Sequence, residues 1–273
     1  MSITWNSLYL WCEDTEQIAD RIRQILTDKG YTLYDPFGMM PGRAYPQTVR
    51  LFVMPPQAGW SRVVGLCTPD GRVETVLLPA LSSVGLTLAV SLDETQSQIT
   101  VAADGAEADP VAGLEAHLRA GCTADDLRAA LAISGEAATR QRTGDVPVDL
   151  LPDDIRAMAN KVNSRQVEKF FNKIMRQLGR SMGDKQQAAR DMLNNGHADW
   201  SAPAGQRVFA LIACLTMPDD WRTPDFVTLR DAYQLHLRRQ QRPDAMLYPG
   251  DAEAMAAFPD ALHCVPVYGG KLD

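Results

Sequence analysis

The sequence contains few cysteines and few aromatic residues. The five cysteines are odd in number, widely spaced and without a Cys-x-x-Cys pair: Cys12, Cys67, Cys122, Cys214 and Cys264. This pattern argues against a secreted disulfide framework and favours a reducing compartment, with each cysteine a small core residue rather than a nucleophile or metal ligand. Aromatic residues are only 7% of the chain, which suits helices better than a β-sandwich.

The sequence also lacks a long hydrophobic run. Residues 209–217 are apolar but far shorter than the roughly 20 residues that a membrane helix needs. Residues 76–90 are interrupted by Pro79, Ser82 and Ser83, and residues 1–11 contain neither Lys nor Arg, so a secretory signal is not expected. We therefore expect a cytoplasmic protein without a transmembrane segment.

Catalytic motifs are absent or out of place. The sequence has no GxxxxGK[ST] loop, no GxGxxG after a strand and no HExxH. Residues 179–183 match the letters of GxSxG, but a nucleophile elbow follows a strand, and a predicted helix precedes this match. His197 and Asp199 are two possible ligands in one loop, which is too few for a metal site. We therefore assign no catalytic residue, no metal and no cofactor.

The length of 273 residues predicts about two domains at roughly 150 residues each. The first hundred residues alternate apolar or β-branched runs with helical periodicity. Strands are expected at 8–11, 31–34, 49–54, 61–67, 86–92 and 97–102, and helices at 13–29 and 75–84. The fold expected for this part is α+β or α/β, with a mixed sheet.

The middle of the chain changes composition. Thr123 and Asp126 form a helix-start pattern for a helix to about residue 133. Residues 135–148 have no hydrophobic periodicity, which is typical of a linker. We expect an acidic domain with a helical extension over 1–135 and a linker over 136–150.

The rest of the chain is predicted to be helical. Helices are expected at 163–178, 184–193, 205–217 and 223–241. The last of these would have Thr223 as N-cap and Pro224 as its first residue. Pro and Gly in residues 243–273 indicate an irregular tail, so 151–273 is expected to be an all-α helical bundle domain with an irregular C-terminal tail.

Charge is distributed unevenly along the chain. Residues 1–150 hold 19 acidic and 11 basic side chains, whereas residues 151–250 hold 11 acidic and 15 basic ones. Within 156–190 there are nine bases and two acids. Such asymmetry indicates a polyanionic or acidic partner.

The spacing of these bases defines a cationic stripe, made of six residues at intervals of three or four: Lys161, Arg165, Lys169, Lys173, Arg176 and Arg180. On a helix they fall within an arc of roughly 120°. Val167, Phe170, Phe171 and Ile174 lie among the apolar residues on the opposite side. One face can then pack in a bundle while the other presents a row of positive charges.

Four interpretations of the cationic stripe are open. It is a solvated helix face, an intramolecular contact with the acidic domain, a nucleic-acid surface, or a surface for an acidic protein or anionic membrane. Arg238, Arg239 and Arg242 would extend a nucleic-acid surface, although they also suit the C-terminal dipole of their helix. An isoelectric point near 5.2 counts against a dedicated nucleic-acid-binding protein.

The function expected from the sequence is that of a non-catalytic adaptor or accessory subunit. It would engage a polyanionic or acidic partner, with nucleic acid as one candidate, through the cationic stripe and the three arginines at 238, 239 and 242. One alternative is an enzyme with a site between its domains, including His197 and Asp199. Another is a structural subunit that only assembles with itself or with another protein.

Overall fold

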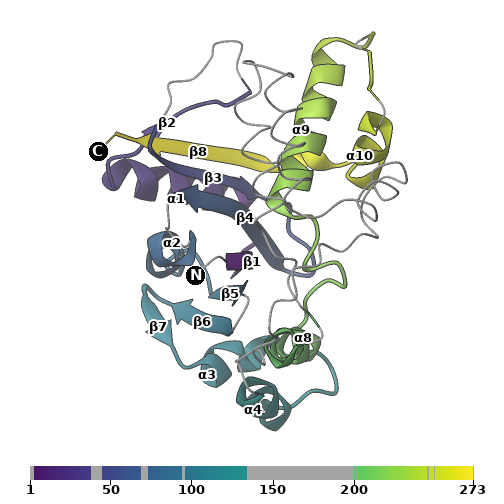
Figure 1. Cartoon of the computed structure of the whole chain (residues 1–273). Helices are drawn as coiled ribbons and strands as arrows, with labels where there is room; N and C mark the ends of the chain where they lie inside the picture. Colours follow the sequence, from purple (N-terminus) through teal and green to yellow (C-terminus); the bar gives the residue numbers. More distant parts are fainter. Residues whose placement is uncertain are drawn as a thin grey trace, which may run out of the picture. The chain divides into compact units, whose positions relative to one another are not determined.

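An antiparallel sheet organises the chain. The computed structural model describes residues 3–37, 45–68, 73–93, 96–133, 200, 202–244, 246–248 and 250–272. Within this part, eight strands form one sheet in the order β2-β8-β3-β4-β1-β5-β6-β7, with every neighbouring pair antiparallel (Figure 1). The strands are β1 (Ile3–Trp11), β2 (Thr32–Leu33), β3 (Gln47–Val53), β4 (Trp60–Thr68), β5 (Thr87–Asp93), β6 (Ser97–Ala103), β7 (Ala106–Ala108) and β8 (Val265–Lys271).

Helices cover both faces of this sheet. Apolar residues of α1 and α2 pack on one face, while those of α8 and α9 pack on the other. β5 is buried along its whole length because it has helices on both sides. The helices are α1 (Thr15–Asp28), α2 (Val73–Leu81), α3 (Pro110–Leu114), α4 (Ala124–Ala132), α8 (Pro203–Cys214), α9 (Phe226–Gln241) and α10 (Asp251–Ala257), with short 3-10 turns η1 (Glu115–His117) and η3 (Ala261–His263).

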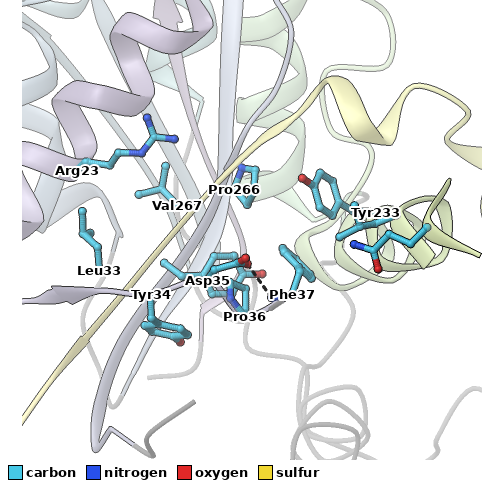
Figure 2. A pocket seen from close by; sticks show the side chains of 12 residues that line it. Arg23, Leu33, Tyr34, Asp35, Pro36, Phe37, Tyr233, Pro266 and Val267 are labelled. Carbon is cyan, nitrogen blue, oxygen red and sulfur yellow. Dashed lines mark hydrogen bonds between the residues drawn. The ribbon is translucent and has the colours of Figure 1, made fainter. Parts of the chain in front are cut away.

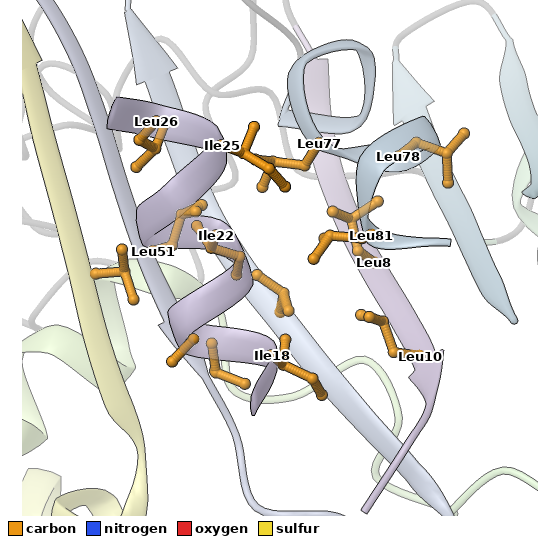
Figure 3. Packing of buried hydrophobic residues seen from close by; sticks show 14 of the residues in the cluster. Leu8, Leu10, Ile18, Ile22, Ile25, Leu26, Leu51, Leu77, Leu78 and Leu81 are labelled. Atoms are coloured by element: carbon orange, nitrogen blue, oxygen red, sulfur yellow. The ribbon is translucent and has the colours of Figure 1, made fainter. Parts of the chain in front are cut away.

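The core beneath α1 follows from the two periodicities of strand and helix. Leu8 and Leu10 of β1 point to α1 and α2, whereas Tyr9 between them points to the opposite face. Ile18 and Ile22, at helical spacing on α1, are fully buried against these leucines (Figure 3). The helix predicted over 13–29 is confirmed as α1, and its regularly spaced isoleucines face the core.

Capping residues define the ends of α1 and the start of α4. The Asp14 side chain accepts the backbone N–H of Gln17 at 2.9 Å and caps α1. α1 ends before Gly30, whose φ of +82° suits glycine. At α4, Thr123 is the N-cap, as the sequence predicts, and the Asp126 side chain in turn accepts the backbone N–H of Thr123 at 2.8 Å.

The predicted strands are found, and the hairpin of 86–92 with 97–102 corresponds to β5 and β6. The expectation of a mixed sheet is wrong, since every pairing in the described part is antiparallel. At the start of α9, Asp225 and not Thr223 is the N-cap, because its carboxylate accepts the Thr228 N–H at 2.9 Å. α9 therefore begins at Phe226, and Pro224 precedes the helix instead of being its first residue.

The C-terminal segment differs most from expectation. Residues 243–273 are not an irregular tail, because they contain α10 and β8. β8 pairs with β3 on one side and β2 on the other, so the end of the chain completes the sheet that the beginning starts (Figure 1). All described residues belong to one compact unit. An all-α bundle domain is not seen in the described part, and the expected linker and the helices at 163–178 and 184–193 lie outside it.

Candidate functional site

The predicted partner-binding residues fall into two groups. All six residues of the cationic stripe lie outside the described residues, as do His197, Asp199 and the GxSxG match at 179–183. Arg238 and Arg239 lie in the last turn of α9, and Arg242 is its C-cap. This places three cations where the helix dipole favours positive charge.

Arg238 is engaged within its own unit. Its guanidinium donates a hydrogen bond to the carbonyl of Met246 and lies 5.8 Å from the ring centroid of Tyr248. These contacts hold the segment that follows α9. Arg239 and Arg242 are exposed, whereas Arg238 is half-buried.

A pocket of about 570 Å³ lies beside α9, within the size range of small-molecule sites. One side of α9 lines it through residues four apart (Tyr233, Leu237 and Gln241), while the chain after β2 and the strand β8 supply the other walls (Figure 2). Its remaining lining residues are Arg23, Leu33, Tyr34, Asp35, Pro36, Phe37, Pro266, Val267 and Tyr268.

The pocket lies where the pairing of β2 with β8 ends. β2 pairs with β8 only at Gly269 and Gly270, and the Tyr34 N–H then donates to the Tyr268 carbonyl at 3.1 Å. Pro266, two residues earlier, faces the same edge, because the direction of backbone polar groups alternates along a strand. Having no N–H, Pro266 leaves no unpaired donor there and opposes addition of another strand.

Aromatic rings form much of the pocket wall. The ring of Phe37 lies 4.8 Å from that of Tyr233 and 5.8 Å from that of Tyr268, measured between centroids. Tyr34 meets Tyr268 edge to face at 5.8 Å. Rings that pack against one another in this way are held in place, so they give the pocket fixed walls.

Two charged side chains line the pocket. The Asp35 carboxylate is exposed and accepts the backbone N–H of Phe37 at 2.8 Å, which fixes the turn through Pro36. Arg23 of α1 is paired with Asp20 at 2.6 Å and lies 3.5 Å from Glu16. Burial and, secondly, the negative charge of Asp35 raise the pKa of the Tyr233 hydroxyl, so Tyr233 stays a neutral hydrogen-bonding group.

A second polar cluster anchors the segment between α8 and α9 to the sheet. The guanidinium of Arg62, which is 6% exposed, donates to Ser7 Oγ at 2.9 Å and to the Arg222 carbonyl at 3.2 Å. Burial lowers the pKa of Arg62, while the nearby Tyr9, Asp220 and Asp225 act in the opposite direction. The adjoining cavity of about 20 Å³ has room for little more than one water molecule. This cluster therefore has a structural role.

Trp60 of β4, together with Trp200 and Trp221, contributes to the core. Trp60 and Trp221 are buried, and the Trp200 ring packs edge to face on Trp5 at 5.2 Å. None of the five cysteines is in a disulfide, and Cys214 and Cys264 are buried. Among the described residues no cluster of His, Cys, Asp or Glu is suited to a metal ion. No helix in that same part is long and apolar enough to cross a membrane.

Sequence reasoning did not find the pocket. Its lining comes from four separate segments, and no single segment carries a motif. Within the lining, residues 35–37 (Asp-Pro-Phe) have a turn-like sequence, which indicates a loop but not a binding site. In comparisons with known proteins, no family model, curated protein or solved structure matches this chain.

Proposed function

We propose that the protein is a non-catalytic adaptor or accessory subunit that engages a polyanionic partner, with nucleic acid the partner to test first, through the cationic stripe. The observation that carries this proposal is the spacing of the six cations opposite an apolar face. A row of bases at intervals of three or four residues places neighbouring charges about 5–6 Å apart on a helix. Such a row of positive charges can contact successive phosphates along one nucleic-acid strand.

The division of charge supports the same proposal. The segments 1–137 and 198–273, which make up the unit described above, carry 27 acidic and 16 basic side chains, a net charge of −11. The segment 138–197 carries 7 acidic and 11 basic side chains, a net charge of +4. A polyanion is repelled by the net charge of the first and attracted by that of the second, which favours the stripe as the main binding region.

The exposed arginines at the end of α9 are a second contact region under this proposal. Arg239 and Arg242 are exposed, whereas Arg238 is half-buried and is held by Met246 and Tyr248. We therefore expect Arg242→Glu to weaken binding less than a reversal within the stripe, and Arg238→Glu to act mainly through the fold of the segment after α9.

The test is fluorescence anisotropy of labelled single-stranded and double-stranded oligonucleotides with the full chain. The triple variant Lys169→Glu, Lys173→Glu and Arg176→Glu should abolish binding without lowering the unfolding midpoint. A single variant of the stripe, Lys173→Glu, has a matched control in Arg128→Glu, because Arg128 is exposed on α4 and forms an ion pair with the nearby Asp125. These two single variants change the net charge by the same amount. Equal weakening of binding by the two would therefore show a general charge effect and refute a specific stripe. Unchanged binding in the triple variant would refute the proposal.

A further inference from the structure

The pocket beside α9 has an excess of negative charge. Among the described residues that line it, Arg23 is the one base, and Glu16 and Asp20 already neutralise its charge. Asp35 is the acid in the lining, and no Lys, Arg or His of the described residues lies within ion-pair distance of it. A bound anion would therefore gain little from Arg23, whose charge is already neutralised, whereas a bound cation could form an ion pair with the Asp35 carboxylate.

The aromatic walls favour the same sign of ligand charge. The faces of aromatic rings carry partial negative charge and attract ammonium groups within about 6 Å. Phe37 and Tyr233 lie next to Asp35 in the pocket lining, on the chain after β2 and on α9 (Figure 2). A cation placed among them meets both a carboxylate and ring faces, while its apolar parts contact Leu237 and Pro266.

The field of the whole unit acts in the same direction. Its net charge of −11 raises the local concentration of small cations and lowers that of anions. Size is compatible as well, because about 570 Å³ holds a small organic molecule with space to spare.

We propose that the pocket formed by α9, β8 and the Asp35–Phe37 turn binds a small organic cation, an amine or a quaternary ammonium compound. Asp35 supplies the counter-charge, Phe37 and Tyr233 supply ring faces, and Gln241 at the end of α9 supplies an uncharged polar group at the rim. This binding site is independent of the cationic stripe and of any nucleic-acid partner.

The first test compares choline with its uncharged isostere 3,3-dimethylbutan-1-ol, by calorimetric or NMR titration of the full chain. The two probes have nearly the same shape and differ in charge. We expect saturable binding of choline in the millimolar range or tighter, and binding of the alcohol at least threefold weaker. Acetate serves as the anionic probe and should not bind.

Variants assign the binding to this pocket. Asp35→Asn keeps an oxygen that accepts the Phe37 N–H but removes the charge, so it should weaken choline binding about threefold to fivefold, the size expected for a partly exposed ion pair. The matched control is Glu107→Gln, because Glu107 is an exposed acid on β7 at the opposite edge of the sheet from β2. It should leave choline affinity unchanged.

The rings are tested by a second pair. Tyr233→Leu should weaken choline binding about threefold, because it removes a ring face. Tyr233→Phe retains the ring and should bind as the wild type does. The unfolding midpoint of each variant shows whether it is folded.

Several results would overturn the proposal. These are no choline binding up to 20 mM, equal binding of choline and the alcohol, preferential binding of acetate, or equal weakening by Asp35→Asn and Glu107→Gln. Equal loss in both Tyr233 variants, with unchanged midpoints, would exclude the ring from the site.

Discussion

The hydroxyl of Tyr9 connects the centre of the sheet to the segment between α8 and α9, and its removal has a calculable effect. Tyr9 is 1% exposed, and its hydroxyl donates to the Trp221 carbonyl at 2.6 Å. Tyr9→Phe preserves the packing of the ring and removes the donor from a buried carbonyl, which costs about 1–3 kcal/mol. For a folded unit of this size the melting temperature should fall by about 2–4 °C for each kcal/mol.

The same substitution changes how stability depends on pH. Burial raises the pKa of Tyr9 from 10.0 to about 12 in the folded chain. The neutral phenol is therefore favoured by folding, and this contribution is complete below pH 10 and is lost as pH rises from 10 to 12. Two pKa units correspond to about 2.7 kcal/mol. The advantage of the wild type over Tyr9→Phe should thus shrink, and can reverse, across this range.

Urea unfolding followed by tryptophan fluorescence measures both effects. Trp5, Trp200 and Trp221 pack on one another with ring centroids 5.2–5.6 Å apart, so they report directly on this region. Tyr248→Phe is the matched control, because Tyr248 is 62% exposed and its stability change should stay within about 0.5 kcal/mol. A change below 0.3 kcal/mol for Tyr9→Phe at pH 8, or a difference from wild type that is constant between pH 9 and 12, would refute this reasoning.

Two further substitutions test the core and the capping of the described unit. Ile22→Ala should cost about 2–5 kcal/mol in urea unfolding, because Ile22 is fully buried between α1 and the sheet, and a loss below 1 kcal/mol would contradict that packing. Thr123→Ala should cost about 1 kcal/mol, because it removes one half of the capping box of α4, whereas Thr123→Ser should retain most of the stability. Equal losses in the Ala and Ser variants would show that the hydroxyl does not cap the helix.

Elements with strong local signals were predictable from the sequence. Isoleucines at 18, 22 and 25 place α1 on a core, and the apolar run at 8–11 indicates the strand β1, whose two different faces are seen only in the structure. The turn residues between β5 and β6 indicate a hairpin, which needs only local pairing. In these segments periodicity and capping agree, so local sequence is sufficient.

β8 could not be predicted in this way, because its stability comes from distant partners. Val267 pairs with Leu51 and Gly270 pairs with Thr48, more than 200 residues earlier in the chain. Pro266 and the two glycines lower the strand propensity of the segment, which explains the expectation of an irregular tail. Gly270 is needed for packing, since a Cβ there would lie 2.2 Å from the ring of Tyr45.

The candidate site shows the same limit. Charge spacing along one segment is readable from the sequence, so the cationic stripe is a prediction from local pattern alone. The pocket combines Arg23, Asp35, Tyr233 and Tyr268, which meet only because β8 returns to the sheet beside β2. A site assembled from distant residues has no local signature.

The salt dependence of oligonucleotide binding tests the central proposal most directly. Each phosphate contact on duplex DNA contributes a slope of about −0.9 to the plot of log affinity against log salt concentration. If the six cations of the stripe contact phosphates, the slope for the wild type should approach −5, and the triple variant at residues 169, 173 and 176 should show no measurable binding even at 50 mM salt. No binding of the wild type at 50 mM salt, or the same affinity and slope in the wild type and the triple variant, would contradict the account.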